Sequence, residues 1–242
     1  MATGLRAKAI VFDYYETLAE LSTSMRERLF DEIAESVGAH LQPGEAFRHW
    51  REGIISDSAV RLGGSDRPSP DGPAPPFVSF RDTWLKRFDD LFRLWEVDEP
   101  PETAASAYSS AHAQALVYTD VRPALETLRG RFRLGLLADA DRDQLHAGVK
   151  LNGLEFEAVV TSEDVGAYKP HISAFQTVCE RLGVSPRQAV YIGDRPWADI
   201  EGARHAGLEP VWINRVGRSW PEDLAPPANV VASISELADL LT

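Results

Sequence analysis

Four charged residues, far apart along the chain, have types and spacing that could perform chemistry together. Asp13 and Asp194 each follow a short apolar run typical of a buried strand, Asp199 lies five residues further on, and Lys169 precedes a helix-like stretch. An acidic residue at the carboxyl end of a parallel strand lies where open α/β sheets bind their ligands. Three carboxylates meeting at one sheet edge would repel one another without a cation, and all-oxygen ligation suits Mg²⁺. A lysine beside them would offset negative charge on an anionic substrate.

Each of these residues also has a purely structural interpretation. Asp13 could cap the turn that follows it, and Asp194 could belong to a simple Gly-Asp turn. Asp199 could be an acidic residue at a helix start, and Lys169 could be a surface lysine. Their joint occurrence in this order favours one shared site over four independent structural roles.

The elements that must position these residues are a first strand before the insertion and, after residue 121, strands that alternate with helices. Strands are predicted at 9–12, 133–138, 158–161, 189–193, 210–213 and 230–232, and helices at 123–130, 143–149, 172–182, 198–206 and 234–241. Such alternation implies right-handed crossovers and a parallel sheet. The predicted fold class is α/β, a Rossmann-like parallel sheet with an inserted α-helical cap.

Residues 19–117 have the pattern of that helical insertion. Helices are predicted from Ser22 or Thr23 to Gly38, from about 43 with Phe47, Trp50 and Ile54 on one side, from Ser79 with an apolar stripe, and over 103–116. The segment 63–76 is rich in glycine and proline, and we expect a mobile loop that cannot pack. The core domain is then expected to comprise 1–18 and 118–242.

Composition narrows the possible classes of protein. The chain has 242 residues, of which 44% are hydrophobic, and a formal net charge of −12. No run of five basic residues occurs, so we expect neither nucleic acid nor a membrane as a partner. The single cysteine, Cys179, excludes an intrachain disulfide and any multi-cysteine zinc site. No apolar signal segment precedes the first strand, which predicts a cytoplasmic protein. A monomer and a homodimer both stay open, because the apolar stripe of the insertion could pack against a partner subunit or against its own core.

Three motifs resemble those of the haloacid dehalogenase (HAD) superfamily, in an order that spans nearly the whole chain. They are Phe-Asp-Tyr-Tyr-Glu-Thr-Leu at 12–18, Lys-Pro at 169–170, and Gly-Asp-Arg-Pro-Trp-Ala-Asp at 193–199 with Gly-Ala at 202–203. The resemblance implies a Rossmann-like core under a helical cap. It also implies that Asp13 is a nucleophile that forms an aspartyl intermediate, which water then cleaves.

The resemblance also implies roles for the neighbouring residues. Thr17 would help to fix the turn after the nucleophile, and Lys169 would bridge Asp13 and the substrate anion. The expected ligands of Mg²⁺ are Asp13, the backbone carbonyl of Tyr15, Asp194 and, in support, Asp199. The expected substrate-binding residues are Tyr15, Arg51, Ala138 and Asp139.

The chain departs from HAD phosphatases at several of these positions. Tyr15 stands where they have a second aspartate, a general acid that contributes on the order of 10²–10⁴ in rate. Ala138 replaces a serine or threonine that would hydrogen-bond the phosphoryl group, and Asp139 adds a negative charge unless it turns away. Glu16 replaces a glycine and could conceivably act as the missing acid.

Some of these departures resemble the 2-haloacid dehalogenases of the same superfamily, whose halide leaves without a proton. These enzymes often carry tyrosine at the position of Tyr15, and their cap has a Trp-Arg pair like Trp50-Arg51, whose arginine faces substrate or halide. The segment 211–215 also resembles them. The positions that differ from the dehalogenases are Ala138, Asp139, Phe175 and the Gly-Asp-Arg at 193–195. Arg51 could equally be a solvated helix arginine.

Three hypotheses about function follow. The first is a Mg²⁺-dependent hydrolase that acts on a small, phosphorylated and therefore anionic metabolite, with slow turnover or a substrate that has a good leaving group. The second is a metal-independent 2-haloacid dehalogenase. The third is a HAD scaffold with impaired catalysis that has a binding or regulatory role.

Overall fold

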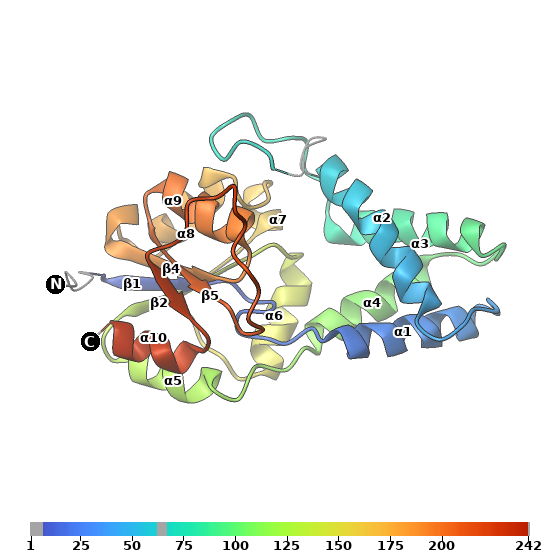
Figure 1. Cartoon of the computed structure of the whole chain (residues 1–242), viewed down its shortest axis with the longest axis horizontal. Helices are drawn as coiled ribbons and strands as arrows, with labels where there is room; N and C mark the ends of the chain where they lie inside the picture. The colour runs from blue at the N-terminus through green and yellow to red at the C-terminus, as the bar shows by residue number, and fades with distance from the viewer. Residues whose placement is uncertain (1–6, 62–66, 242) are drawn as a thin grey trace.

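The computed structural model describes residues 7–61 and 67–241 of the chain. Its centre is a six-stranded sheet in the order β3-β2-β1-β4-β5-β6, in which every neighbouring pair of strands is parallel (Figure 1). The strands are β1 (Ala9–Phe12), β2 (Arg133–Ala138), β3 (Ala158–Thr161), β4 (Ala189–Gly193), β5 (Glu209–Ile213) and β6 (Asn229–Val231). The predicted α/β class with a Rossmann-like parallel sheet is confirmed.

Strand β1 lies in the middle of the sheet, between β2 and β4, and its residues are completely buried. Phe12 is in register with Leu136 of β2 and Ile192 of β4. The backbone N–H of Asp13 donates to the carbonyl of Ile192 at 2.8 Å, which extends the ladder by one residue. Because parallel strands end on the same side, the residues after β1 and β4 emerge at one edge of the sheet.

Helices cover both faces of the sheet, as alternation along β1 requires. Ile10 and Phe12 belong to one apolar cluster, and Ala9 and Val11 belong to another on the opposite face. The first cluster includes α5 (Val121–Arg129), α6 (Arg142–Leu151) and α10 (Ile234–Leu240), and the second is covered by α7 (Ser162–Val165), α8 (Ile172–Arg181) and α9 (Gly202–Ala206). In the described part of the chain, no helix has the length and apolar character needed to cross a membrane.

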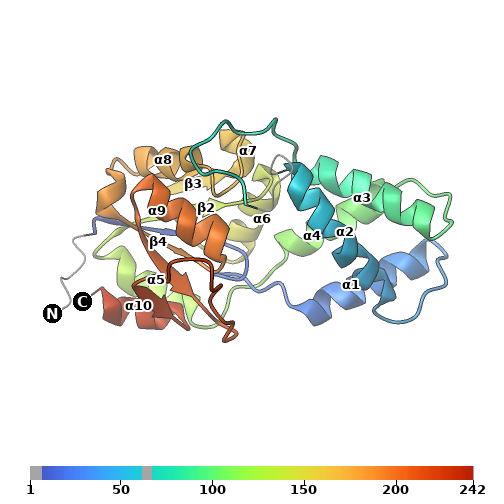
Figure 2. The same ribbon diagram turned by 45° about the horizontal axis from the view of Figure 1, so that its top comes forward.

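The inserted segment forms a helical body with an aromatic core of its own. Its helices are α1 (Thr23–Ser36), α2 (Glu45–Arg61), α3 (Phe80–Leu94) and α4 (Glu102–Ala113). Phe30, Trp50, Phe88 and Tyr108, one from each helix, pack together, with ring centroids of Phe30 and Trp50 5.0 Å apart. Figures 1 and 2 both show these helices beside the sheet rather than on one of its faces. That 19–117 and the remainder of the chain behave as separate domains stays a prediction.

The starts of α1 and α3 have the predicted caps, whereas α4 ends earlier than expected. Ser22 accepts a hydrogen bond from the backbone of Met25, and Ser79 does so from the backbone of Asp82. Helix α4 stops at Ala113 instead of 116 because the chain after it turns back to the core, where Val117 pairs with Ala19. The predicted helix at 198–206 begins instead as a π-helix, Pro196–Glu201, that continues into α9.

The segment between α2 and α3 contacts the core, contrary to the expectation that it cannot pack. The first residues of the predicted mobile loop 63–76 lie outside the described part of the chain, which omits 62–66. In the remainder, the backbone of Ile172 donates to the carbonyl of Pro70 at 2.8 Å, and the His171 ring lies 3.0 Å from the carbonyl of Gly72. The Phe77 ring stacks on Tyr168 at 5.1 Å. Backbone carbonyls and one aromatic ring suffice to hold a segment with few apolar side chains.

We predict that His112 lowers the stability of the protein in acid. Its ring, on α4, packs between aromatic side chains, 4.5 Å from Tyr108 and 5.4 Å from Tyr15, and burial lowers the pKa of His112 from 6.5 to about 4. Between these values the unfolded chain binds more protons than the folded chain, so the free energy of unfolding falls as the pH falls. The full effect of this residue is about 3 kcal/mol at most.

Urea unfolding of the wild type and of His112→Phe between pH 7.5 and 4.5 measures this effect. The variant should lose less stability than the wild type over that range, whatever its stability at pH 7.5. His146→Gln removes an exposed histidine and serves as the control, which should follow the wild type. Equal losses in the wild type and in His112→Phe would show that His112 does not carry the pH dependence.

Candidate active site

The ammonium group of Lys169 lies at the centre of a buried polar cluster. Its Nζ donates to Asp13 Oδ1 at 2.6 Å, to Asp199 Oδ1 at 2.7 Å and to the Tyr191 hydroxyl at 2.9 Å. The Lys169 side chain is only 1% exposed. Burial alone would lower the pKa of Lys169, but Asp13 and Asp199 raise it well above its usual value, so the lysine stays charged.

Asp199 is held on both of its oxygen atoms. Oδ1 accepts from Lys169 and from Tyr191, the latter at 3.2 Å, and Oδ2 accepts from the backbone N–H of Arg195 at 2.9 Å. The residue is completely buried, within the π-helix Pro196–Glu201. These bonds make Asp199 suitable to position the lysine and the loop that carries Asp194.

The close approach of Asp199 to the end of β4 requires glycine at position 193. A Cβ atom on Gly193 would lie 2.5 Å from the Asp199 carboxyl group, where no carbon atom fits. The glycine at the end of β4 therefore has a steric cause. Asp194, the next residue, emerges at the same edge of the sheet as Asp13.

Asp13, Asp194 and Asp199 form a group that could hold a metal ion. One carboxylate oxygen from each lies within 4.8 Å of the others, and all three residues are buried. Asp13 uses only Oδ1 toward Lys169, and Asp194 uses only Oδ2, which accepts from Arg218 at 3.3 Å. Within the part of the chain that the structure describes, Asp13 Oδ2 and Asp194 Oδ1 accept no hydrogen bond, so each residue keeps one oxygen that could ligate a cation.

The charge balance of this group fits a cation. Burial raises the pKa of Asp13 to about 7 despite the attraction of Lys169, and burial together with Asp199 raises the pKa of Asp194 to about 6. Carboxyl groups whose ionisation is this unfavourable lack sufficient positive charge nearby. A divalent cation with oxygen ligands, such as Mg²⁺, would supply it.

The turn that follows Asp13 is anchored from a distant part of the chain. Arg215, after β5, donates to the carbonyl of Thr17 at 2.9 Å and pairs with both oxygens of Asp120. Thr17 is completely buried, and its hydroxyl has no hydrogen-bond partner among the described residues. The backbone of Thr17 thus takes part in an anchored turn, and the role of its side chain stays a prediction.

Asp139 turns away from the nucleophile. In this orientation its negative charge need not repel an anionic substrate. Its Oδ1 accepts from the backbone N–H of Lys169 at 3.0 Å, and its Oδ2 lies 3.6 Å from a guanidinium nitrogen of Arg195. Burial raises the pKa of Asp139. Ala138, the last residue of β2, is completely buried and offers no side-chain donor.

Tyr15 lies beside the nucleophile with a buried hydroxyl group. Its ring packs edge-on against Tyr14 at 5.0 Å and against His112 of the helical insertion. Its hydroxyl has no hydrogen-bond partner among the residues described. That the Tyr15 carbonyl ligates a cation stays a prediction.

Two of the predicted residues do not join the cluster. Arg51 is exposed on α2, and no hydrogen bond or ion pair between described residues links it to the cluster; its neighbour Trp50 is buried in the aromatic core of the insertion. Glu16 accepts from the backbone of Leu21 at 3.0 Å and from the Tyr118 hydroxyl at 3.3 Å. These bonds hold the Glu16 carboxylate at the turn, and a role for Glu16 as a general acid stays a prediction.

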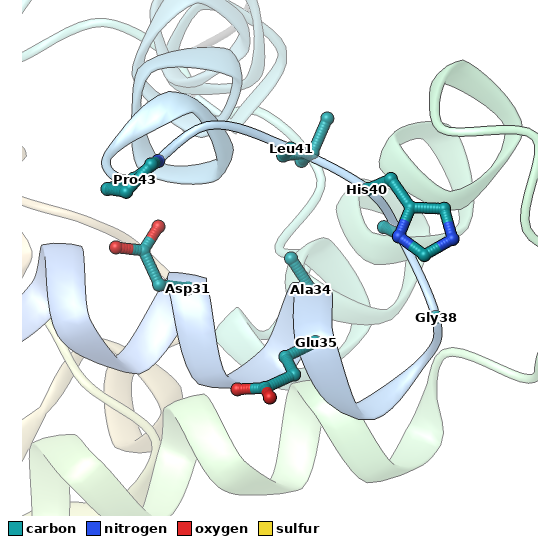
Figure 3. Close-up of a pocket in the computed structure, with 8 residues that line it drawn as sticks. Asp31, Ala34, Glu35, Gly38, His40, Leu41 and Pro43 are labelled. Atoms are coloured by element: carbon teal, nitrogen blue, oxygen red, sulfur yellow. The ribbon is translucent and has the colours of Figure 1, made fainter.

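A separate cavity of about 420 Å³ lies in the helical insertion, between α1 and the loop that follows it (Figure 3). It is lined by Asp31, Ala34, Glu35, Gly38, Ala39, His40, Leu41 and Pro43. Two carboxylates and no lysine or arginine face it, so it does not suit an anionic substrate. Asp31 also accepts from the backbone of Gly44, which gives it a structural role.

Sequence reasoning missed several residues that the structure places in or next to the cluster. Tyr191 lies within the apolar strand β4. Only the alternation of side chains along this strand could have indicated that Tyr191 faces Lys169. Arg215 was noted only as part of a similar segment. Arg218 lies in an irregular stretch without a motif, yet it reaches Asp194.

Residues 7–207 match the family described as haloacid dehalogenase-like hydrolase. The chain is 26% identical to (S)-2-haloacid dehalogenase 4A of Burkholderia cepacia, over 97% of this chain and 94% of that protein. It is 31% identical to the glyceraldehyde 3-phosphate phosphatase of Methanopyrus kandleri, over 86% of this chain and 84% of that protein.

A solved dehalogenase structure with an intermediate complex has the same fold. It is similar with a TM-score of 0.73 and 26% identity, over 98% of this chain and 97% of that chain. Relatives named as phosphatases and relatives named as dehalogenases thus both match most of the chain. The comparisons leave the choice between these two chemistries to the residues of the site.

We predict that Mg²⁺ raises the melting temperature of the protein at pH 8 and that this effect weakens as the pH falls toward 5. A carboxyl group with a raised pKa destabilises the folded chain above that pKa, and protons compete with the ion below it. At a concentration 100 times its dissociation constant, the ion should add about 2.7 kcal/mol to the free energy of unfolding.

Thermal melts with Mg²⁺ or with EDTA at each pH test this prediction. Asp194→Asn should abolish the stabilisation, and Asp143→Asn, at an exposed position of α6, should retain it. Stabilisation that is equally large in Asp194→Asn would place the ion elsewhere on this acidic protein.

Proposed function

We propose that this chain, which belongs to the haloacid dehalogenase-like hydrolase family, is a Mg²⁺-dependent phosphatase that acts on small phosphorylated metabolites. The observation that carries the proposal is the buried group of Asp13, Asp194 and Asp199 around Lys169. When ionised, the three carboxylates contribute three negative charges and the lysine contributes one positive charge. The excess of negative charge, which the half-exposed Arg218 beside Asp194 offsets only in part, favours a divalent cation.

This balance favours phosphoryl chemistry over carbon–halogen chemistry. A haloacid dehalogenase needs no cation beside its nucleophile, and a second buried acidic residue such as Asp194 would only repel its carboxylate substrate. A phosphatase needs positive charge at the same place, because a phosphate ester brings negative charge to a carboxylate nucleophile.

The residues have distinct roles in the proposed reaction. Asp13 attacks phosphorus through a carboxylate oxygen, the bond from phosphorus to the leaving oxygen breaks, and water then cleaves the aspartyl phosphate to give inorganic phosphate and free Asp13. Lys169 holds the Asp13 carboxylate in place and offsets charge on the phosphoryl oxygens. The buried hydroxyl of Thr17 is available as a further donor. Mg²⁺, held by Asp13 and Asp194, would neutralise charge that develops on the transferred group.

The identity of residue 15 limits the leaving group. Tyr15 replaces the acidic residue that would protonate a departing alcohol, and burial raises the pKa of its hydroxyl well above the usual value. A phenol with a raised pKa is a weak acid for this purpose. Acyl and aryl phosphates, whose leaving groups need no proton, are therefore better substrates than alkyl phosphates.

A 2-haloacid dehalogenase is the second candidate, supported by Tyr15 and by the similarity to dehalogenases along nearly the whole chain. In that reaction Asp13 would attack carbon, halide would leave with the bonding electrons, and water would cleave the resulting ester. An inactive scaffold with a binding role is the third possibility. One set of assays separates all three.

We predict that the protein releases inorganic phosphate from acetyl phosphate and p-nitrophenyl phosphate in Mg²⁺ but not in EDTA. Turnover of glycerol 3-phosphate should be at least about 100-fold slower, since general-acid catalysis contributes on the order of 10²–10⁴ in rate. Asp13→Asn should abolish release, because the nucleophile is lost, and Asp143→Asn should leave it unchanged.

The same protein is incubated with 2-chloropropionate, and chloride is measured in Mg²⁺ and in EDTA. Chloride release that survives EDTA, together with absent phosphate release, would replace the phosphatase by the dehalogenase. Absence of both products would favour the inactive scaffold, unless beryllofluoride forms a Mg²⁺-dependent adduct on Asp13.

A further inference from the structure

A cavity of about 200 Å³ adjoins Lys169 at the edge of the site already described. It is lined by Lys169, Pro170, Arg195, Pro196, Trp197, Ala198 and Arg218. Three of these residues are cationic and none is acidic. Once a divalent cation neutralises the carboxylates of the adjoining site, a cavity with this lining attracts anions, and its volume suits a group of a few non-hydrogen atoms.

The two arginines retain most of their hydrogen-bonding capacity. Arg195 lies 3.6 Å from Asp139, and Arg218 donates one hydrogen bond to Asp194. In the part of the chain that the structure describes, these are the only ion pairs of the two side chains, which are 54% and 55% exposed. A guanidinium has five N–H donors in a planar fork, so each arginine can still bind a carboxylate or a phosphate through two of them.

Trp197 supplies an independent indication of a ligand. Its indole N–H is buried and has no acceptor among the described residues. A buried donor without an acceptor is costly, and an oxygen atom of a bound ligand would satisfy it. The guanidinium of Arg67, from the segment before α3, lies 5.6 Å from the centroid of the same ring and pairs with Asp223 of the core. The ring thus also contacts the segment between α2 and α3 of the insertion.

We propose that this cavity binds a second anionic group of the substrate, a carboxylate or a second phosphate, through Arg195, Arg218 and the Trp197 indole. The inference rests on the proposed phosphatase function, with the transferred phosphoryl group at Asp13 and Lys169. Lys169 lies between the two positions, because it contacts Asp13 and also lines the cavity. The substrate class is then a short phosphorylated acid or a compact bisphosphate, and a neutral phosphorylated alcohol is a poor substrate.

Matched phosphonates, which cannot be hydrolysed, test the subsite by binding alone. Isothermal titration in excess Mg²⁺ compares phosphonoacetate with ethylphosphonate, and 3-phosphonopropionate with propylphosphonate. At least one carboxylate-bearing compound should bind about tenfold more tightly than its partner, the gain expected of a charge-assisted contact. Arg195→Gln and Arg218→Gln should each lose most of that advantage, and Arg187→Gln, an exposed arginine outside the cavity, should keep it.

The outcomes separate this inference from the proposed function. An advantage that depends on Arg195 and Arg218 supports the subsite even if no phosphate ester is turned over, in which case only the phosphatase proposal fails. Phosphate release without any advantage for the carboxylate compounds overturns the subsite and leaves the phosphatase. An advantage that persists in both arginine variants also overturns it, because the extra anion then binds elsewhere.

Discussion

The site depends on one buried ammonium group. Lys169 can remain charged inside the protein only because Asp13 and Asp199 each accept a hydrogen bond from it, with Tyr191 as a third acceptor. These partners lie 156, 30 and 22 residues away along the chain, so the lysine ties the first strand, the lysine loop and the fourth strand together. Removal of both carboxylates would leave a buried positive charge without compensation. The need to balance this buried charge explains why these residues occur together.

The parallel sheet satisfies that requirement with little adjustment. The in-register pairing of β1 with β4 delivers Asp13 and Asp194 to the same edge, and the absence of a side chain at Gly193 lets Asp199 approach. Arg215 then fixes the turn after Asp13 through a backbone carbonyl. Because the constraints come from strand ends and backbone groups, the site is positioned before any substrate binds. A preorganised site of this kind needs little rearrangement in the reaction.

The periodic elements and the principal acidic residues could be predicted from the sequence. The lengths of the strands and their order along the chain follow from the hydrophobic pattern. Asp13, Lys169 and Asp194 stand in recognisable local motifs. Side-chain direction could not be predicted, because it depends on partners distant in sequence. Asp139 is the clearest example, since it turns to the backbone of Lys169, 30 residues on.

The helical insertion shows the same limit of sequence reasoning. Its aromatic stripe predicted a helical body, and Phe30, Trp50 and Phe88 form one. That the glycine- and proline-rich segment would lie on the core could not be foreseen, because its contacts use backbone carbonyls rather than apolar side chains. The sequence also left two alternatives for Arg51, a substrate contact or a solvated helix arginine, since a Trp-Arg pair on a helix does not show which of its faces meets the core.

Ala138 and Asp139 differ from both the HAD phosphatases and the 2-haloacid dehalogenases. These two positions are better understood together than one at a time. Ala138 lacks a hydroxyl donor and Asp139 adds a charge, and each alone argues against binding an anion at the end of β2. In the structure Asp139 lies beside Arg195, and Asp194 accepts from Arg218, so the two acidic residues orient two arginines at the rim of the site. Arg195 and Arg218 line one cavity beside Lys169 and supply donors that the motif positions lack. A comparison of one motif position at a time overlooks them.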